Sequence, residues 1–140
     1  MDRGNSEGMT KQELRQIYSL NREIKMWKRE LVELECKSLV GAQIITGMPR
    51  GGDGEGNNIE SLVIEKERIQ NIIKDLIFKV QEQRENILEY INTIDDSMMR
   101  QIIFYRHVLC YSWTKIAIEM GGGNTADGIR IMHDRFIKKM

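Results

Sequence analysis

Two runs of apolar residues that recur at alternating steps of three and four constrain the fold of this chain most strongly. Such spacing is typical of a heptad seam, along which one long helix packs against another. The first run comprises Ile17, Leu20, Ile24, Trp27, Leu31 and Leu34. The second comprises Ile59, Leu62, Lys66, Ile69, Ile73, Leu76, Val80, Gln83, Ile87, Tyr90 and Ile94, of which Lys66 and Gln83 are polar. The sequence therefore predicts two long helices that pack through these seams.

The segment between the two runs, residues 41–57, contains six glycines and the only proline of the chain, Pro49. That density predicts a flexible loop, because each glycine in a helix costs about 1 kcal/mol relative to alanine. Two long helices joined by a loop fold back most simply as an antiparallel hairpin. Residues 10–94 are therefore expected to form a helical hairpin.

Capping residues predict where the two helices begin. Thr10 and Glu13 have the spacing of a capping box, in which each side chain bonds the other residue's backbone amide. Asn57 or Asn58 is expected to cap the second helix. The polar residues 1–9 precede the first cap and are expected to be disordered.

The second helix carries more apolar residues than one hairpin can bury. The surplus lies off the main seam, so another helix is expected to pack there, from the C-terminal region or from a second copy of the chain. We therefore expect residues 10–94 to act as an oligomerisation region of a homodimer or a larger homo-oligomer. The surplus residues are Ile64, Ile72, Ile77, Phe78, Leu88 and Ile91.

Composition narrows the class of protein. No apolar run approaches the roughly 20 residues that a membrane span needs, and the polar N-terminus is not that of a signal peptide. The two cysteines, Cys36 and Cys110, form no CxxC pair and are interpreted as buried, reduced thiols. We therefore expect a soluble protein of the cytoplasm that contacts no membrane.

Residues 95–140 are predicted to form three short helices, at 97–110, 112–120 and 125–138. A turn of three glycines and Asn124 separates the last two, which is the outline of a helix-turn-helix DNA-binding domain. The expected caps are Asp96 or Ser97, Ser112, and Asn124 with Asp127 reciprocating. The inward face of the third helix is expected to consist of Ile129, Met132 and Phe136. The whole chain is thus predicted to be all-α.

Charge is distributed unevenly along the chain. Residues 97–140 carry seven basic and three acidic side chains, a net charge of +4, while residues 1–96 carry 14 basic and 18 acidic ones, a net −4. A basic C-terminal region on an acidic helical region is the pattern expected if only the former meets phosphates. Double-stranded DNA is therefore the predicted partner.

The predicted DNA contacts cluster around the second and third short helices. Arg130 is expected to pair with guanine, Asn124 with adenine or a phosphate, and Asp127 to accept from cytosine or to orient Arg130. Thr125 lies at the N-terminus of the third helix, where such helices approach base edges. Residues expected to meet phosphates are Ser112, Thr114, Lys115, Arg135, Lys138 and Lys139.

The run RQIIFYRHVLCYSWTKIAIEMGGGNTADGIRIMHDRFIKK, at the centre of residues 95–139, resembles phage regulators of the ArpU/RinA type. Their DNA-binding domain is a helix-turn-helix like region four of sigma-70 factors. The features that match are the Arg100–Val108 run, Ser112-Trp113 followed by Ile116-Ala117, and the Asn124-to-Asp127 opening of the third helix. The resemblance implies a bacteriophage or prophage protein of the bacterial host cell that controls late genes, with bacterial RNA polymerase as a further partner.

Other functions remain open at this point. The chain has no H-E-x-x-H, no G-x-S-x-G and no cysteine ligand set, so we expect no enzyme, no cofactor and no metal. The alternative is a phage small terminase subunit, which joins a DNA-binding domain to helical oligomerisation segments and binds packaging-site DNA as a ring. A third possibility is a coiled-coil adaptor that does not bind DNA.

Overall fold

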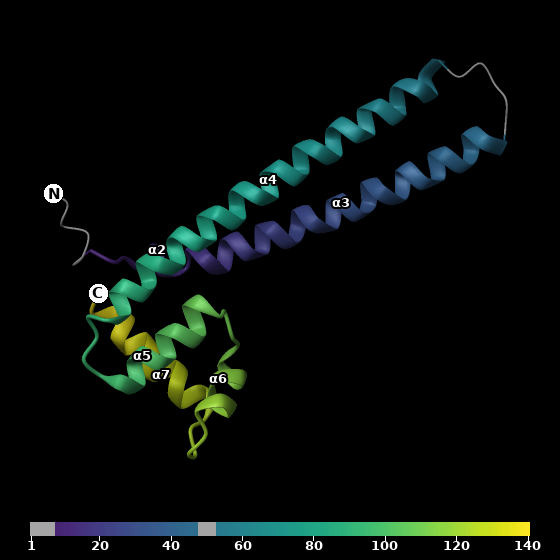
Figure 1. Ribbon diagram of the computed structural model, residues 1–140. Coiled ribbons are helices and arrows are strands. Elements are labelled where there is room, and N and C mark those ends of the chain that lie inside the picture. The colour runs from purple at the N-terminus through teal and green to yellow at the C-terminus, as the bar shows by residue number, and fades with distance from the viewer. Residues whose placement is uncertain (1–7, 48–52) are drawn as a thin grey trace. The chain divides into compact units, whose positions relative to one another are not determined.

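The computed structural model describes residues 8–47 and 53–140, and over these residues the chain is all-helical (Figure 1). The predicted all-α class, a long helical hairpin followed by a small helical region, is thus confirmed. No described helix is long and apolar enough to cross a membrane. The elements are α2 (Lys11–Leu14), α3 (Gln16–Gly47), α4 (Asp53–Ile91), α5 (Ser97–Ile103), the π-helical turn η1 (Phe104–Val108), α6 (Trp113–Met120) and α7 (Ala126–Lys138).

The chain divides into two compact units. The hairpin unit comprises the described residues between Arg22 and Phe78, and the head unit comprises the described residues up to Asn21 and from Lys79 onward. The start of α3 and the end of α4 thus belong to the same unit as α5, α6 and α7. The head unit begins well before residue 95, where the sequence placed the domain boundary.

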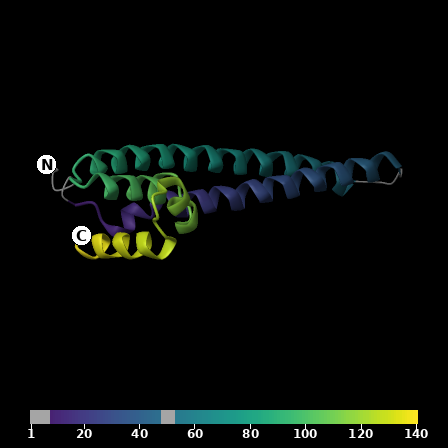
Figure 2. The same ribbon diagram turned by 90° about the horizontal axis from the view of Figure 1, so that it is seen from below.

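Within the hairpin unit, α3 and α4 run antiparallel and side by side (Figures 1 and 2). Five seam residues are buried between them: Ile24, Leu34, Ile69, Ile73 and Leu76. Burying one such side chain contributes about 1.5 to 3 kcal/mol, so this seam holds the pair together. The heptad spacing therefore predicted the contact face of both helices.

The connection between the long helices is shorter than the predicted loop at residues 41–57. α3 continues to Gly47 and α4 already begins at Asp53, upstream of the caps expected at Asn57 or Asn58. Glycine disfavours a helix but does not break one that is already nucleated, because each added residue gains a backbone hydrogen bond. The central part of the predicted loop, residues 48–52, lies outside the described residues.

The N-terminal segment contributes to the head unit. Thr10 and Glu13 form the predicted capping box, with the Thr10 Oγ1 atom accepting from the Glu13 amide at 3.1 Å. Residues 1–7 of the predicted disordered stretch lie outside the described residues, but Met9 packs against the head core. The helix that follows was expected to be continuous, yet it breaks at Arg15 into α2 and α3. Beside this break, Gln83 Nε2 of α4 donates to the Glu13 carbonyl at 3.0 Å. Gln83, one of the two polar seam residues, therefore has a hydrogen-bond partner.

The core of the head unit is built from every helix in it. Leu14 and Ile17 come from α2 and α3, and Ile87 from the end of α4. The rest of the chain adds the remaining buried apolar residues: Ile91, Ile94, Met99, Ile102, Ile103, Val108, Ile116, Ala117, Ile129 and Ile137. Ile91 and the half-buried Leu88, both predicted to lie off the hairpin seam, therefore pack into this core.

The joint between η1 and α6 has an unusual backbone. Cys110 is the one non-glycine residue of the described chain with a positive φ, +60°. The Arg106 guanidinium donates to the Tyr111 carbonyl at 2.9 Å and lies 4.2 Å from the centre of the Trp113 ring, which fixes the joint. The Cys110 thiol is half-buried, and burial raises its pKa, whereas Cys36 is exposed, contrary to the expectation of two buried thiols.

Candidate nucleic-acid interface

A turn of three glycines connects α6 to α7. Gly121, Gly122 and Gly123 have φ angles of +62°, +65° and +81°, in the left-handed region that side chains with a Cβ disfavour. The Asn124 side chain closes the turn, since its Nδ2 donates to the Gly121 carbonyl at 2.7 Å. Its backbone amide donates to the same carbonyl at 3.2 Å. The turn is thus held by two hydrogen bonds to one carbonyl, one from the side chain of Asn124 and one from its backbone amide.

The cap of α7 is one residue later than predicted. Thr125, and not Asn124, is the N-cap, and its Oγ1 accepts from the Gly128 amide at 3.0 Å. Asn124 is engaged in the turn, so its side chain is not directed at the helix start. Asp127 therefore does not complete a capping box, and its carboxylate points to Arg130 instead.

The two faces of α7 have different roles. At 100° per residue, positions four apart share a face, and Ile129, His133 and Ile137 are buried on the side that meets the core. Met132 and Phe136, which the sequence placed inward, are half-buried beside them. The opposite face is exposed over Asp127, Arg130, Ile131, Asp134 and Lys138. α7 is thus anchored along one side and open along the other.

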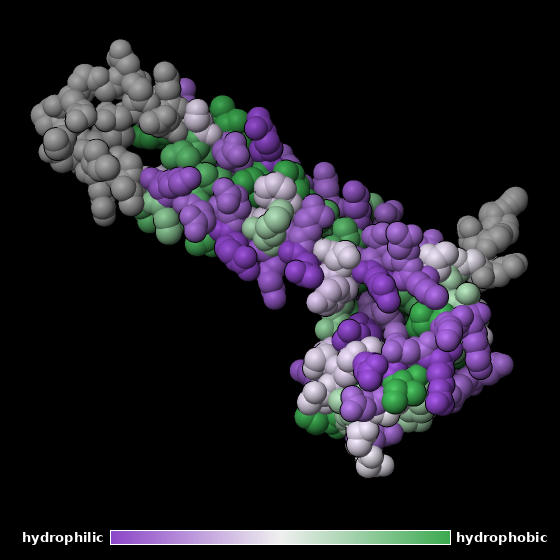
Figure 3. Space-filling view, turned by 180° about the vertical axis from the view of Figure 1, so that it is seen from behind, coloured by the Kyte–Doolittle hydropathy of each residue, from purple (hydrophilic) through white to green (hydrophobic). Residues whose placement is uncertain are grey.

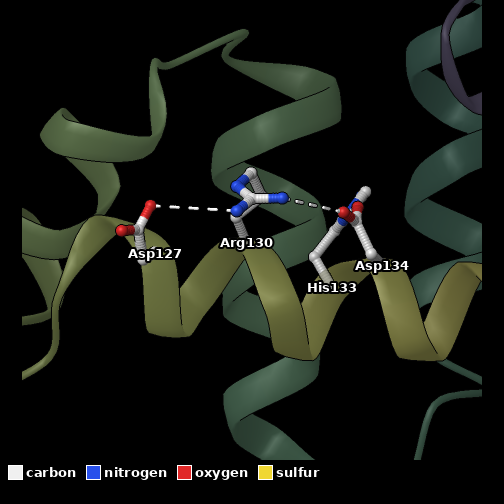
Figure 4. Close-up of polar contacts among 4 residues, drawn as sticks. All are labelled: Asp127, Arg130, His133 and Asp134. Carbon is white, nitrogen blue, oxygen red and sulfur yellow. Dashed lines mark hydrogen bonds and ion pairs between the residues drawn. The ribbon is translucent and has the colours of Figure 1, made fainter.

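Two carboxylates flank the Arg130 guanidinium on the exposed face. Nη2 lies 3.8 Å from Asp127 Oδ1, and Nη1 lies 3.5 Å from Asp134 Oδ2 (Figure 4). Asp134 makes a further contact, because its Oδ1 lies 3.1 Å from His133 Nδ1. Asp127 lies three residues before Arg130 and Asp134 four residues after it. Residues at these spacings are neighbours on a helix surface, so both acids can reach the guanidinium.

A buried histidine pair lies directly beneath this surface cluster. The Nε2 atoms of His107 in η1 and His133 in α7 are 2.8 Å apart, and the rings stack with centroids 5.0 Å apart. The pKa of His107 is lowered to about 3, mainly by burial and further by the charges of His133 and Arg106. Burial also lowers the pKa of His133, although Asp134 opposes this shift. Neither histidine was expected to have a role from the sequence.

The pair is one hydrogen short when both rings are neutral. His107 also hydrogen-bonds the Leu14 backbone, whose amide already donates to Thr10, so the Leu14 carbonyl is the acceptor. Each neutral imidazole carries one N–H, so the two rings together supply two hydrogens. The three contacts, to Asp134, between the rings, and to Leu14, need three. The third hydrogen arrives only if the pair takes up a proton.

The predicted contacts on α6 lie together at its N-terminus. Ser112 caps the helix as predicted, and its Oγ accepts from the Lys115 amide at 3.2 Å. Lys115 Nζ lies 4.4 Å from the centre of the Tyr111 ring, and Thr114 is exposed beside it. The Trp113 and Thr114 amides have no acceptor within the helix, as at any helix start. This end of α6 therefore offers an exposed ammonium together with outward-facing amides.

The remaining predicted contacts lie at the other end of α7. Arg135 and Lys138 are exposed in its last turns and Lys139 directly follows. Two further basic residues of the head unit have structural partners, since Arg106 bonds Tyr111 and Arg100 donates to the carbonyls of Ile94 and Asp95. The predicted site thus separates into an α6 group, an Arg130 group and a C-terminal group.

The described part of the chain contains no group of three or more histidine, cysteine or acidic side chains arranged to hold a metal ion. The candidate interface consists of charged and polar side chains on α7 and at the N-terminus of α6. Comparison with known proteins adds no relative, since no family model, no curated protein and no solved structure matches the chain.

Proposed function

We propose that this protein is a phage or prophage transcriptional regulator that binds double-stranded DNA through α7. One observation carries the proposal: α7 is anchored by Ile129, His133 and Ile137, while its outer face presents polar groups and one exposed isoleucine after a short α6 and a glycine turn. An α-helix of this kind fits the major groove of B-form DNA.

The exposed groups of α7 suit base edges. The Arg130 guanidinium has the fork of donors that pairs with O6 and N7 of guanine. Ile131 is 42% exposed between charged neighbours and offers an apolar contact for a thymine methyl group. Asn124 and Thr125 are already engaged in the turn and the cap, so they support the helix start and leave base contacts to Arg130 and Ile131.

Phosphate contacts are assigned to the other two groups. Lys115 and the α6 N-terminal amides suit one phosphate, because a helix N-terminus and an ammonium both favour an anion. The C-terminal residues Arg135, Lys138 and Lys139 suit further phosphates. The net charge of +4 over residues 97–140 supports this assignment.

Self-association is part of the proposal. Large apolar side chains remain exposed in the hairpin unit, where Figure 3 shows hydrophobic residues among hydrophilic ones. Pairing two heads on one duplex raises affinity without any new contact, since the second binding event becomes intramolecular. The exposed apolar residues are Met26, Val32, Leu39, Ile59, Val63, Ile64, Ile77 and Phe78.

The biological setting follows from the resemblance of residues 95–139 to phage regulators of the ArpU/RinA type. On that basis we assign control of late genes, with bacterial RNA polymerase as a second partner in the cytoplasm of the bacterial host. A small terminase subunit would share the DNA-binding head but form a ring of many copies. Mass measurement of the purified protein by light scattering separates the two, because a dimer supports the regulator and a large ring supports the terminase.

The proposal is tested by selecting duplexes from a random pool and measuring their affinity across salt concentrations. We expect the logarithm of the affinity to fall with the logarithm of the salt concentration, by about 0.9 for each phosphate contacted. Arg130→Ala should relax one base position, with a loss of about 1 to 3 kcal/mol in discrimination. Combined Lys138→Ala and Lys139→Ala should weaken all sequences alike and reduce the salt slope.

A lysine outside the proposed surface provides the control. Lys74 is exposed in the hairpin unit, so Lys74→Ala removes one positive charge, as Arg130→Ala does, without removing a proposed contact. Its affinity should remain close to that of the unsubstituted protein. If no duplex is shifted at low salt, the chain is not a DNA-binding protein and the adaptor alternative gains support.

A further inference from the structure

The contacts of Asp134 differ from those of Asp127, the other acid on α7. Its side chain is 57% exposed, yet Oδ1 lies 3.1 Å from Nδ1 of His133, whose side chain is only 8% exposed. His133 is itself fixed by His107 at 2.8 Å and by the Trp113 ring, whose centroid is 4.8 Å from its own. A surface carboxylate is thus tied to the core of the head unit.

Asp127 provides the comparison within the same helix. It contacts the same guanidinium as Asp134, at 3.8 Å instead of 3.5 Å, and its side chain is 88% exposed. The described structure gives its carboxylate no partner besides Arg130. Two acids of equal charge therefore flank Arg130, of which Asp134 also contacts a buried histidine and Asp127 contacts Arg130 alone (Figure 4).

We infer that Asp134 is a positioning residue, which the buried His107–His133 pair holds in place so that it orients the Arg130 guanidinium for a base. The inference rests on the proposed function in naming DNA as the partner, but the ordering of Arg130 is a property of the free protein. A long arginine side chain loses several rotatable bonds of freedom when it binds, and this cost falls if the bound orientation is already populated.

The physical consequence is a separation of affinity from specificity. Both acids repel phosphates, so removing either charge should raise the affinity for any duplex. Only the anchored acid restricts the guanidinium, so only its loss should impair discrimination between guanine and other bases at the Arg130 position. A purely electrostatic role would make the two acids equivalent.

Two variants that each remove one charge test this difference. Asp134→Asn and Asp127→Asn should raise nonspecific affinity to a similar extent. Asp134→Asn should also lower discrimination at the base position that Arg130→Ala identifies, by about two- to fivefold, the range that an exposed ion pair can supply. Asp127→Asn should leave that ratio unchanged, and Asp134→Glu, which restores the charge, should recover part of it.

A measurement without DNA keeps the inference separate from the proposed function. Nitrogen-15 relaxation of the Arg130 Nε–H group should show a restricted side chain in the unsubstituted protein and in Asp127→Asn, and a mobile one in Asp134→Asn. His133→Phe keeps an aromatic ring at this position but removes the nitrogen that faces Asp134. It should therefore make the Arg130 side chain mobile as well.

The outcomes are distinct. If no duplex binds but Arg130 is ordered by Asp134, the proposed function fails and the positioning role stands. If Arg130 is equally mobile in both Asp→Asn variants, or both lose discrimination equally, the positioning role is wrong even when DNA binds. Should His133→Phe fail to fold, the comparison of Asp134→Asn with Asp127→Asn still decides.

Discussion

His107 Nε2 lies 2.8 Å from His133 Nε2 inside the head unit, and this contact joins η1 to α7 across 26 positions of sequence. Both rings are buried, and the positive charges of Arg106 and Arg15 lie close enough to disfavour a proton on either of them. Asp134 is the one acid that favours it, on the His133 side. The pair is therefore neutral near pH 7.

Stability of the head unit should fall as the pH decreases below about 6.5. The pKa of His107 is about 3 in the folded protein, whereas an unfolded chain holds it near 6.5, so between these values the unfolded state binds more protons. Going from pH 7.5 to pH 5 should cost roughly 2 kcal/mol from His107 alone. Urea unfolding at several pH values measures this slope.

A variant without the titrating group checks the cause. His107→Gln keeps a donor and an acceptor at the position but cannot take up a proton. It should be less stable than the unsubstituted protein at pH 7.5 and lose less stability on acidification. If His107→Gln loses as much stability between pH 7.5 and 5 as the unsubstituted protein, other groups cause the pH dependence.

The sequence predicts structure well where the cause is local. The caps at Thr10, Asp96 and Ser112 follow from side chains that bond amides two or three residues away, and all three are present. The prediction for α7 was one residue off, because Asn124 and Thr125 are both good caps and only the glycine turn decides between them. Local chemistry therefore predicted these four helix starts to within one position, whereas α4 begins at Asp53, well upstream of the caps expected at Asn57 or Asn58.

The histidine pair was not predicted, because its cause is a contact between distant parts of the sequence. His107 and His133 meet only after the chain has folded, and no short motif joins them. A signal did exist, since His133 stands four residues after Ile129 and four before Ile137, on the face that a 3.6-residue period turns inward. A polar residue at such a position needs a buried partner, and the other histidine of the chain was the natural candidate.

The helix start of α7 provides a second prediction, concerning Gly128. A Cβ at this position would lie 3.0 Å from Thr125 Oγ1, the capping atom. Gly128→Ala should therefore gain less than the about 1 kcal/mol expected of a helical glycine. In a Thr125→Gly background the obstruction is gone, and the same substitution should gain the full amount.

A double-mutant cycle by urea unfolding measures this coupling. The two substitutions should be non-additive, because the residues share one hydrogen bond. Gly128→Ala in a Thr125→Ser background is the control, since serine keeps the hydroxyl and should keep the obstruction. Equal gains in all three backgrounds would show that the cap hydroxyl moves aside at no cost.

The glycine turn gives a third prediction. Gly122 has a φ of +65° and nothing within 4 Å of the Cβ that a substitution would add. Gly122→Ala should therefore destabilise the head unit by about 1 to 2 kcal/mol, a cost that is conformational and not steric. Gly122→Asn should cost less, because asparagine tolerates the left-handed region. Identical stabilities of the two variants would argue against the left-handed turn.

The last prediction concerns the apolar surface of the hairpin unit. Ile64 and Phe78 are 56% and 60% exposed and stand fourteen residues apart, two heptads along one line of α4. We expect this line to contact a second copy of the chain, so Ile64→Ser with Phe78→Ser should shift the mass measured by light scattering toward the monomer. Because both side chains are exposed, the substitutions should change the stability of the monomer by no more than about 0.5 kcal/mol each.

The head unit supplies a matched control for that experiment. Ile118 on α6 is 72% exposed, so Ile118→Ser removes one exposed isoleucine, as Ile64→Ser alone does, far along the sequence from α4. It should leave the mass unchanged. DNA affinity gives a second measure, since the Ile64→Ser and Phe78→Ser variant should lose the gain from paired heads while keeping its base preference. A mass that is unaffected by the double substitution places the self-association surface elsewhere on the hairpin unit or excludes it.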